Sequence, residues 1–146
     1  MSRYAAWLAR GARVAVDLGG ERREVFVRTG GNGGCCTLLH GFPTSSFDWH
    51  QQWDALAGEH RLLALDFLGF GDSDKPAEHV YSIHEQADLT ERLWELHGVE
   101  RTSLLVHDYA VSVALELLAR RRDGVLAVAI ERVVFLNGGL FPELHR

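Results

Sequence analysis

Asp108 is the residue whose type and position in this sequence are best suited to covalent chemistry. It follows the apolar run Thr102–Val106 and precedes a helix-forming stretch that begins at Tyr109, so it falls where a strand turns directly into a helix. A carboxylate is an anion at neutral pH without help from a base, and displacement at a saturated carbon needs an anion. Attack by Asp108 on an epoxide or a carbon–halogen bond would leave an ester on the protein.

The same position also has a purely structural interpretation. Aspartate is among the preferred N-cap residues, because its carboxylate accepts hydrogen bonds from the first free N–H groups of a helix. The local pattern alone favours this N-cap role for Asp108. The two interpretations are compatible, and the surrounding elements have to decide between them.

Strands and helices are expected to alternate along most of the chain. Polar and apolar residues alternate on both sides of Gly19-Gly20, which predicts a β-hairpin of Arg13–Leu18 and Arg23–Thr29. Short apolar runs bounded by turn residues predict buried strands, and stretches with helical spacing predict the helices between them. The strands are expected at Cys35–Leu39, Arg61–Phe67, Thr102–Val106 and Ala129–Leu136, and the helices at Ser46–Ala57, Ser82–His97 and Tyr109–Arg122.

Strands that are apolar throughout and are separated by helices are typical of a parallel sheet. We therefore predict an α/β fold in which a hairpin precedes a mostly parallel sheet flanked by helices. Ligands of such sheets bind at the carboxyl ends of the strands. The segments that leave these strand ends, called strand exits below, are His40-Gly41, Asp66–Pro76 and His107-Asp108. We interpret the Gly- and Asp-rich segment Asp66–Pro76 as structural.

Composition and charge restrict the partners. The 146 residues have 47% hydrophobic content and a formal net charge of −5, with no dominant basic face, so we expect no nucleic-acid partner. No segment approaches the length of a membrane span, and Met1–Gly11 lacks the apolar run of a signal peptide. We therefore expect a cytoplasmic protein with no membrane partner. Cys35 and Cys36 are adjacent and provide no disulfide framework, and we expect neither a metal nor a cofactor.

Several long motifs occur in one order along the chain. They are Leu39–Trp49, Leu65–Pro76, Tyr81–Ala87, His107–Tyr109 and Leu136–Arg146. Together they resemble the α/β-hydrolase superfamily, its epoxide hydrolase and haloalkane dehalogenase branch, and within that branch the mesoderm-specific transcript protein family. The likeness extends from about Val14 to the last residue.

The resemblance implies that Asp108 is the nucleophile, held at the sharp strand-to-helix turn called the nucleophile elbow. It also implies that the backbone N–H groups of Phe42 and Tyr109 form an oxyanion hole, which stabilises charge on the ester carbonyl. The family has a small residue at position 106 and glycine at position 110, so Val106 and Ala110 are expected to crowd this elbow.

The substrate implied by the resemblance is a small molecule, namely an epoxide, an alkyl halide or an ester. His40, Pro43 and His107 are the side chains expected to line its pocket. An ester intermediate on Asp108 would be hydrolysed by water that a histidine activates.

The resemblance places the catalytic acid and histidine after the nucleophile, beyond the sixth strand and a helical cap. The histidine that follows Asp108 here, His145, matches a position outside the family's active site. We therefore expect an N-terminal segment at residues 1–11 and a partial α/β-hydrolase core at residues 12–146 that ends after the sixth strand. Such an ending would expose a sheet edge through which the chain can self-associate.

Two alternative functions remain open at this point. One is a catalytically inactive half-domain, because the acid and the base are expected to be missing. The other is a carboxylester hydrolase, which is disfavoured because the chain has no Gly-x-Ser-x-Gly motif. The segment most similar to this motif surrounds Ser112, which falls inside a predicted helix rather than at a sharp turn.

Overall fold

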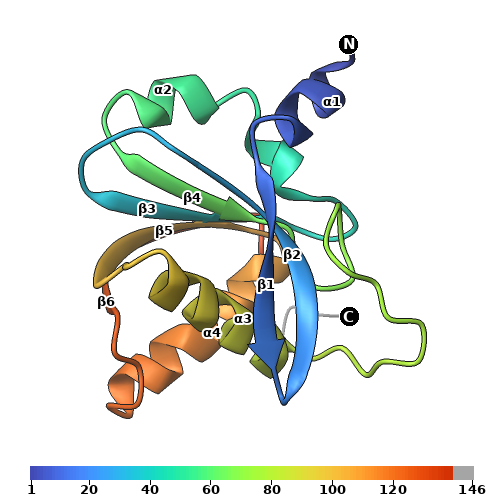
Figure 1. Cartoon of the computed structure of the whole chain (residues 1–146). Coiled ribbons are helices and arrows are strands. Elements are labelled where there is room, and N and C mark those ends of the chain that lie inside the picture. The colour runs from blue at the N-terminus through green and yellow to red at the C-terminus, as the bar shows by residue number, and fades with distance from the viewer. Residues whose placement is uncertain (140–146) are drawn as a thin grey trace.

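The computed structural model describes residues 1–139. One sheet has the strand order β1-β2-β4-β3-β5-β6, and helices cover both of its faces (Figure 1). The strands are β1 Ala12–Leu18, β2 Glu21–Gly30, β3 Cys35–Leu39, β4 Arg61–Leu65, β5 Arg101–His107 and β6 Ala129–Leu136. The helices are α1 Arg3–Leu8, the 3₁₀ helix η1 Ser46–Trp49, α2 Trp53–Ala57, α3 Ile83–Leu96 and α4 Tyr109–Arg122.

The strand pairing confirms the predicted hairpin and the mostly parallel sheet. β1 and β2 are antiparallel, and the turn between them has positive φ angles of 61° at Gly19 and 85° at Gly20, which glycine adopts without steric cost. β2 also pairs antiparallel with β4, whereas β3 runs parallel to both β4 and β5, and β5 runs parallel to β6. Because β3 lies between β4 and β5, the exits of these three strands are neighbours at one end of the sheet.

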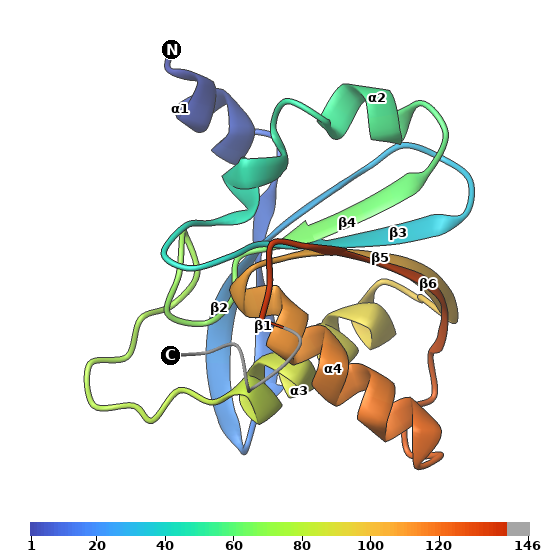
Figure 2. The same cartoon turned by 180° about the vertical axis from the view of Figure 1, so that it is seen from behind.

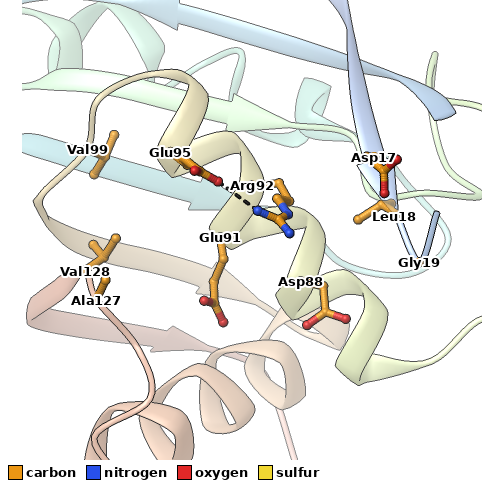
Figure 3. A pocket seen from close by; sticks show the side chains of 10 residues that line it. All are labelled: Asp17, Leu18, Gly19, Asp88, Glu91, Arg92, Glu95, Val99, Ala127 and Val128. Atoms are coloured by element: carbon orange, nitrogen blue, oxygen red, sulfur yellow. Dashed lines mark hydrogen bonds and ion pairs between the residues drawn. The ribbon is translucent and has the colours of Figure 1, made fainter. Parts of the chain in front are cut away.

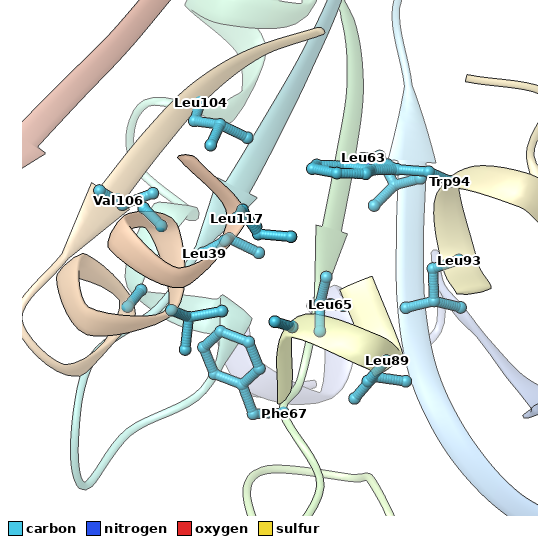
Figure 4. Close-up of a cluster of buried hydrophobic side chains, with 14 of the residues drawn as sticks. Leu39, Leu63, Leu65, Phe67, Leu89, Leu93, Trp94, Leu104, Val106 and Leu117 are labelled. Carbon is cyan, nitrogen blue, oxygen red and sulfur yellow. The ribbon is translucent and has the colours of Figure 1, made fainter. Parts of the chain in front are cut away.

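The larger hydrophobic core lies between the sheet and the pair α3 and α4 (Figure 4). Trp94 of α3 is fully buried there, and its indole N–H donates a hydrogen bond to the Thr37 hydroxyl on β3 at 2.8 Å. α3 begins as predicted, since the Ser82 side chain accepts a hydrogen bond from the Glu85 N–H at 3.1 Å. The buried packing fixes α3 and α4 against the strands that carry the exits.

A smaller core covers the opposite face of the sheet, below α1, η1 and α2 (Figure 2). The sequence predicts one helix over Ser46–Ala57, and this prediction is wrong because the segment divides into η1 and α2. The carbonyl of Phe47 accepts hydrogen bonds from the N–H of His50 at 3.0 Å and from its ring Nδ1 at 2.8 Å. The carbonyl of Phe47 is thus bonded three residues along the chain, as in a 3₁₀ helix, and a continuous α-helix does not form.

β6 is at the edge of the sheet and pairs with β5 alone among the described strands. Val134 and Leu136 on this strand are 50% and 38% exposed. Self-association through this edge stays a prediction. The end of the last sequence motif, residues 140–146, lies outside the described residues and includes His145. Within residues 1–139, no helix combines the length and the apolar character that crossing a bilayer requires.

Candidate active site

The turn between β5 and α4 is backbone-strained at Asp108. Its φ of 51° and ψ of −112° place it in a region that residues other than glycine rarely adopt, at a cost of roughly 1–3 kcal/mol. The Asp108 N–H donates to the carbonyl of Leu136 at 2.9 Å, and its own carbonyl accepts from the Val111 N–H at 2.9 Å. The neighbouring strand and the first turn of α4 therefore hold this conformation from both sides.

The Asp108 carboxylate makes no capping hydrogen bond to α4, so the N-cap interpretation is wrong. Oδ2 accepts a hydrogen bond from the backbone N–H of Phe42 at 2.9 Å instead. None of the described residues donates a hydrogen bond to Oδ1. The carboxylate is partly exposed and has one oxygen held and one oxygen open.

Gly41 allows the loop after β3 to approach this carboxylate closely. A Cβ atom at position 41 would lie 2.8 Å from the Cβ of Asp108 and 3.2 Å from its Oδ2. Real side chains do not tolerate the first of these distances without a shift of the neighbour. The glycine therefore sets how near the Phe42 N–H comes to Asp108.

The expected crowding of the elbow does not prevent its formation. Val106 and Ala110 are both fully buried, and Asp108 between them still adopts the positive φ. Gly138, which follows β6, packs directly against the Val111 side chain, and a Cβ atom at position 138 would clash with it.

His40 lies beneath the site, contrary to the prediction that it lines the substrate pocket. It is fully buried, with its ring centroid 4.9 Å from that of Phe67 and 5.3 Å from that of Phe70. Its Nδ1 is 2.8 Å from the Gly41 carbonyl and donates to it, and its Nε2 accepts from the Phe67 N–H at 3.0 Å. Burial lowers its pKa, so the ring is a neutral tie between the loops after β3 and β4.

Asp66 is a second buried tie between these loops. It is 1% exposed, and its Oδ1 and Oδ2 accept backbone hydrogen bonds at 2.7 Å each from Ser46 and Asp72. Gly71, with a φ of 51°, packs directly against Oδ2 where any Cβ atom would clash. The Asp66 carboxylate thus supports the structural role predicted for the Asp66–Pro76 segment, because it holds this loop to the loop after β3.

Asp66→Asn is expected to lower the free energy of unfolding by about 2–3 kcal/mol. In the unaltered protein the two carboxylate oxygens accept hydrogen bonds from two backbone N–H groups. The asparagine amide has one acceptor oxygen, so its NH₂ group has to face the other N–H donor. Urea unfolding followed by tryptophan fluorescence measures this loss. Asp72→Asn on the same loop is the control, because that side chain is 41% exposed and its contact to Arg13 spans 4.0 Å, so about 0–1 kcal/mol is expected. Equal losses in the two variants would contradict the role of Asp66.

A largely apolar cavity of about 530 Å³ opens beside the Asp108 turn. Phe42, whose N–H is bonded to Asp108, and Tyr109, which follows Asp108 in sequence, belong to its wall, whereas Asp108 itself is not among the lining residues. Burial raises the pKa of the Tyr109 phenol, with the charge of Glu85 adding to the effect. The wall also contains Pro43, Thr44, Gly69, Phe70, Gly71, Lys75 and Tyr81.

His107 lines a different hollow from Pro43, although the two hollows share Thr44. This second hollow measures about 430 Å³ and lies against Trp49 and Leu136. The Nδ1 of His107 is 3.9 Å from the nearer oxygen of Asp48. The structure therefore brings Phe42, Pro43 and Tyr109 together on one cavity and sets His107 in the adjoining one.

Another groove, of about 540 Å³, lies at the opposite end of the sheet from these exits, and Figure 3 shows the side chains that line it. Its lining includes Val99 and Val128, which directly precede the parallel strands β5 and β6, so it sits at the amino ends of those strands. Acidic side chains of α3 dominate its wall, and Arg92 is bonded to Glu95 at 2.9 Å. The strand-exit rule excludes this groove as the reactive site.

Some cavity residues were not predicted from the sequence. Phe70 belongs to the loop after β4, so the strand-exit rule could have found it. Lys75 and Tyr81 are further along the chain, and only the path of that loop places them here. The Lys75 ammonium donates to the Ser73 carbonyl at 3.1 Å, a contact with no signal in the sequence.

Comparison with known proteins agrees with this geometry. The family model described as alpha/beta hydrolase fold matches residues 37–138. The mesoderm-specific transcript homolog protein of Bos taurus is 53% identical over 115 residues, which are 75% of this chain and 34% of that protein. A haloalkane dehalogenase of Sphingobium indicum is 34% identical over 133 residues, or 86% of this chain and 44% of that enzyme.

A solved structure is similar as well. The epoxide hydrolase CorEH, solved without ligand, superposes with a TM-score of 0.74 at 27% identity over 93% of this chain and 46% of that chain. The chain thus spans between 34% and 46% of the length of these relatives. The match of the family model over most of the chain shows that this protein belongs to the α/β-hydrolase fold family.

Proposed function

We propose that this hydrolase-family chain reacts through Asp108 with an epoxide or an alkyl halide and forms an ester. The observation that carries the proposal is the strained Asp108 whose carboxylate is bonded to the Phe42 N–H at 2.9 Å and leaves the helix uncapped. A non-glycine residue with positive φ and without a capping role is typical of a functional site rather than of a structural turn. The relatives named as haloalkane dehalogenase and epoxide hydrolase support the same chemistry.

The two carboxylate oxygens have different roles in this reaction. Oδ1, which has no donor among the described residues, attacks the saturated carbon and forms the new C–O bond. The electron pair of the broken bond leaves on the halide, or on the epoxide oxygen, which then takes a proton from water. Oδ2 becomes the carbonyl oxygen of the ester, and the Phe42 N–H is already in place on it.

The oxyanion donors act in the step that would follow. Addition of water to the ester carbonyl places negative charge on Oδ2, and fixed donors are effective because they need no reorganisation when that charge appears. We propose the N–H of Tyr109 as the second donor. It is the first residue of α4, and the N–H of a first helical residue has no partner within its helix.

Within residues 1–139 no histidine is set to activate water for that step. Both ring nitrogens of His40 are committed to backbone partners, and His107 lines the hollow beside Trp49 rather than the one beside Phe42. We therefore propose that residues 1–139 carry out ester formation and not its hydrolysis. The expected product is a single stable adduct per protein molecule.

Carboxylester hydrolysis through a serine has no support in the site. Ser112 lies inside α4, in the exposed surface of a continuous helix, and a helical backbone cannot present it at a sharp turn. The positive φ belongs to Asp108 alone among the residues of this turn. An alkylating electrophile, and not an activated ester, is therefore the proposed partner.

Incubation with styrene oxide, 1,2-dibromoethane or p-nitrophenyl acetate, followed by intact-protein mass spectrometry, tests the proposal. We expect a single mass addition with each of the first two compounds, the whole epoxide for styrene oxide and a bromoethyl group for 1,2-dibromoethane. We expect no catalytic release of nitrophenol from the third. Continuous diol or halide release by the chain alone would contradict the restriction to ester formation. Absence of any adduct with a panel of epoxides and alkyl halides would contradict the proposed chemistry itself.

A further inference from the structure

A small basic cleft is lined by residues of α1, α2 and β2 and by His50. The helices α1 and α2 lie on the face of the sheet opposite α3 and α4 (Figures 1 and 2). The cleft measures about 170 Å³ and shares no lining residue with the cavity beside Phe42. Its wall consists of Arg3, Ala6, Trp7, Arg10, Arg28, His50, Trp53 and Asp54. The proposed chemistry of Asp108 does not use any of these residues.

Arg28 of β2 is the buried centre of the cleft. It is only 6% exposed, and its guanidinium carbon lies 3.9 Å from the ring centroid of Trp7 and 4.3 Å from that of Trp53. The two indoles are nearly perpendicular, with an interplanar angle of 84°, so the flat guanidinium can lie parallel to at most one of them. Such cation–π contacts hold the side chain in place and leave its N–H groups directed in the plane of the guanidinium.

These N–H groups have no acceptor in the part of the chain that the structure describes. No oxygen of residues 1–139 accepts a hydrogen bond from Arg28, and no carboxylate there lies within 4.0 Å of its nitrogens. The buried side-chain atoms that lack a partner among the described residues are Trp49 Nε1 and His97 Nε2, and no Arg28 nitrogen is among them, so the edge of the guanidinium reaches solvent through the cleft. A largely buried cation without a carboxylate partner favours an anion at such an open edge. Burial lowers the pKa of Arg28, and the charge of Arg10 lowers it further, while Asp54 acts in the opposite direction.

The other charges of the wall favour an anion. Arg3 and Arg10 line the cleft, and neither makes an ion pair or a side-chain hydrogen bond with another described residue. Asp54 supplies the single carboxylate of the lining. The ring of His50 has its Nδ1 2.8 Å from the Phe47 carbonyl, so only its Nε2 remains for another partner.

We propose that this cleft binds a phosphate-type oxyanion through the guanidinium edge of Arg28, with Arg3 and Arg10 at its rim. The planar fork of arginine matches two oxygens of a phosphate group and forms paired, charge-assisted hydrogen bonds. The cleft of about 170 Å³ holds between about five and six water volumes at about 30 Å³ each, which is room for one tetrahedral oxyanion. A cation–π stack without a ligand accounts for the position of Arg28 but provides no acceptor for its N–H groups.

Isothermal titration calorimetry with inorganic phosphate at constant ionic strength tests this site. We expect saturable binding at one site, and Arg28→Gln is expected to weaken it at least about tenfold. Arg10→Gln, at an exposed rim position, is expected to weaken it about two- to fivefold and remains informative if the Arg28 variant does not fold. Arg22→Gln on the same strand is the control, because that side chain is 78% exposed, pairs with Glu24 and lies outside the cleft.

The outcomes against the proposal are equally definite. No saturable heat with the unaltered protein at millimolar phosphate would overturn it, as would unchanged binding in both a folded Arg28→Gln variant and the Arg10→Gln variant. Flotation with phosphatidic acid vesicles, compared with phosphatidylcholine vesicles, identifies the source of the phosphate group. Arg28-dependent binding to free phosphate alone assigns a small anion, and Arg28-dependent binding to the acidic vesicles assigns a lipid headgroup; vesicle binding that persists in Arg28→Gln counts against the site.

Discussion

Asp108→Asn is expected to slow adduct formation with epoxides and alkyl halides by about 10⁴-fold or more. The amide is neutral and is a poor nucleophile, so the first step loses its attacking group. Asparagine also tolerates positive φ better than most residues, and the φ of 51° at this position should be retained. The rate of the mass shift in a time course with 1,2-dibromoethane measures the effect.

The matched control for this substitution is Asp123→Asn. That carboxylate is 56% exposed, pairs with Arg122 at 2.8 Å and lies at the far end of α4. Its replacement is expected to leave the alkylation rate unchanged. Comparable alkylation of Asp108→Asn and the unaltered protein would show that another side chain reacts, and would remove the nucleophile from the proposal.

Gly41→Ala is expected to reduce the alkylation rate about 10²-fold, while the protein stays folded. The new methyl group would lie 2.8 Å from the Cβ of Asp108 and 2.9 Å from Nδ1 of His107. The carboxylate has to move away, and its alignment with the Phe42 N–H is lost. The backbone at position 41 does not have a positive φ, so alanine adds no conformational strain there.

Gly34→Ala separates this contact from the general effect of replacing a glycine. Position 34 also lacks a positive φ, and a Cβ atom there would meet nothing within 4 Å. We expect normal alkylation in this variant and a matching circular dichroism spectrum in both. A Gly41→Ala protein that alkylates at the normal rate would contradict the idea that close approach of this loop positions Asp108.

The hairpin strands could be predicted because polar and apolar residues alternate around Gly19-Gly20, and the four later strands because each is a short apolar run with turn residues at its ends. The division of Ser46–Ala57 into η1 and α2 was not predicted, and the start of η1 makes two contacts with residues that are distant in sequence. The Ser46 N–H is bonded to Asp66, and its hydroxyl accepts from the indole of Trp7 at 3.1 Å. α1 was missed for a related reason: its burial depends on Trp7 packing against Trp53, which periodicity in a short segment does not reveal.

The site shows the same division between local and long-range information. The strand-exit rule placed His40-Gly41 and His107-Asp108 at one end of the sheet, and the family resemblance pointed to Phe42. A 2.9 Å hydrogen bond joins the Phe42 N–H to Asp108. The prediction for His40 was wrong because Phe67 and Phe70, from the loop after β4, cover its ring. Arg28 had no sequence signal, since its unusual environment arises from two tryptophans on different helices.

Phe42 and Tyr109 are proposed to act as oxyanion donors through their backbone N–H groups, so a change in the neighbouring backbone is the way to alter their contribution. The Gly41→Ala variant probes the role of Phe42, because the new methyl group pushes Asp108 away from the Phe42 N–H. The apolar cavity beside both residues suits a small hydrophobic electrophile, since such pockets have mostly aromatic and aliphatic walls with few polar groups.

Peptide mapping of the alkylated protein tests the central claim most directly. After reaction with 1,2-dibromoethane and proteolysis, tandem mass spectrometry should locate the added group on Asp108, and hydroxylamine should remove it because it is an ester. A modification that resists hydroxylamine and maps to Cys35, Lys75 or His107, with Asp108 unmodified, would contradict the account.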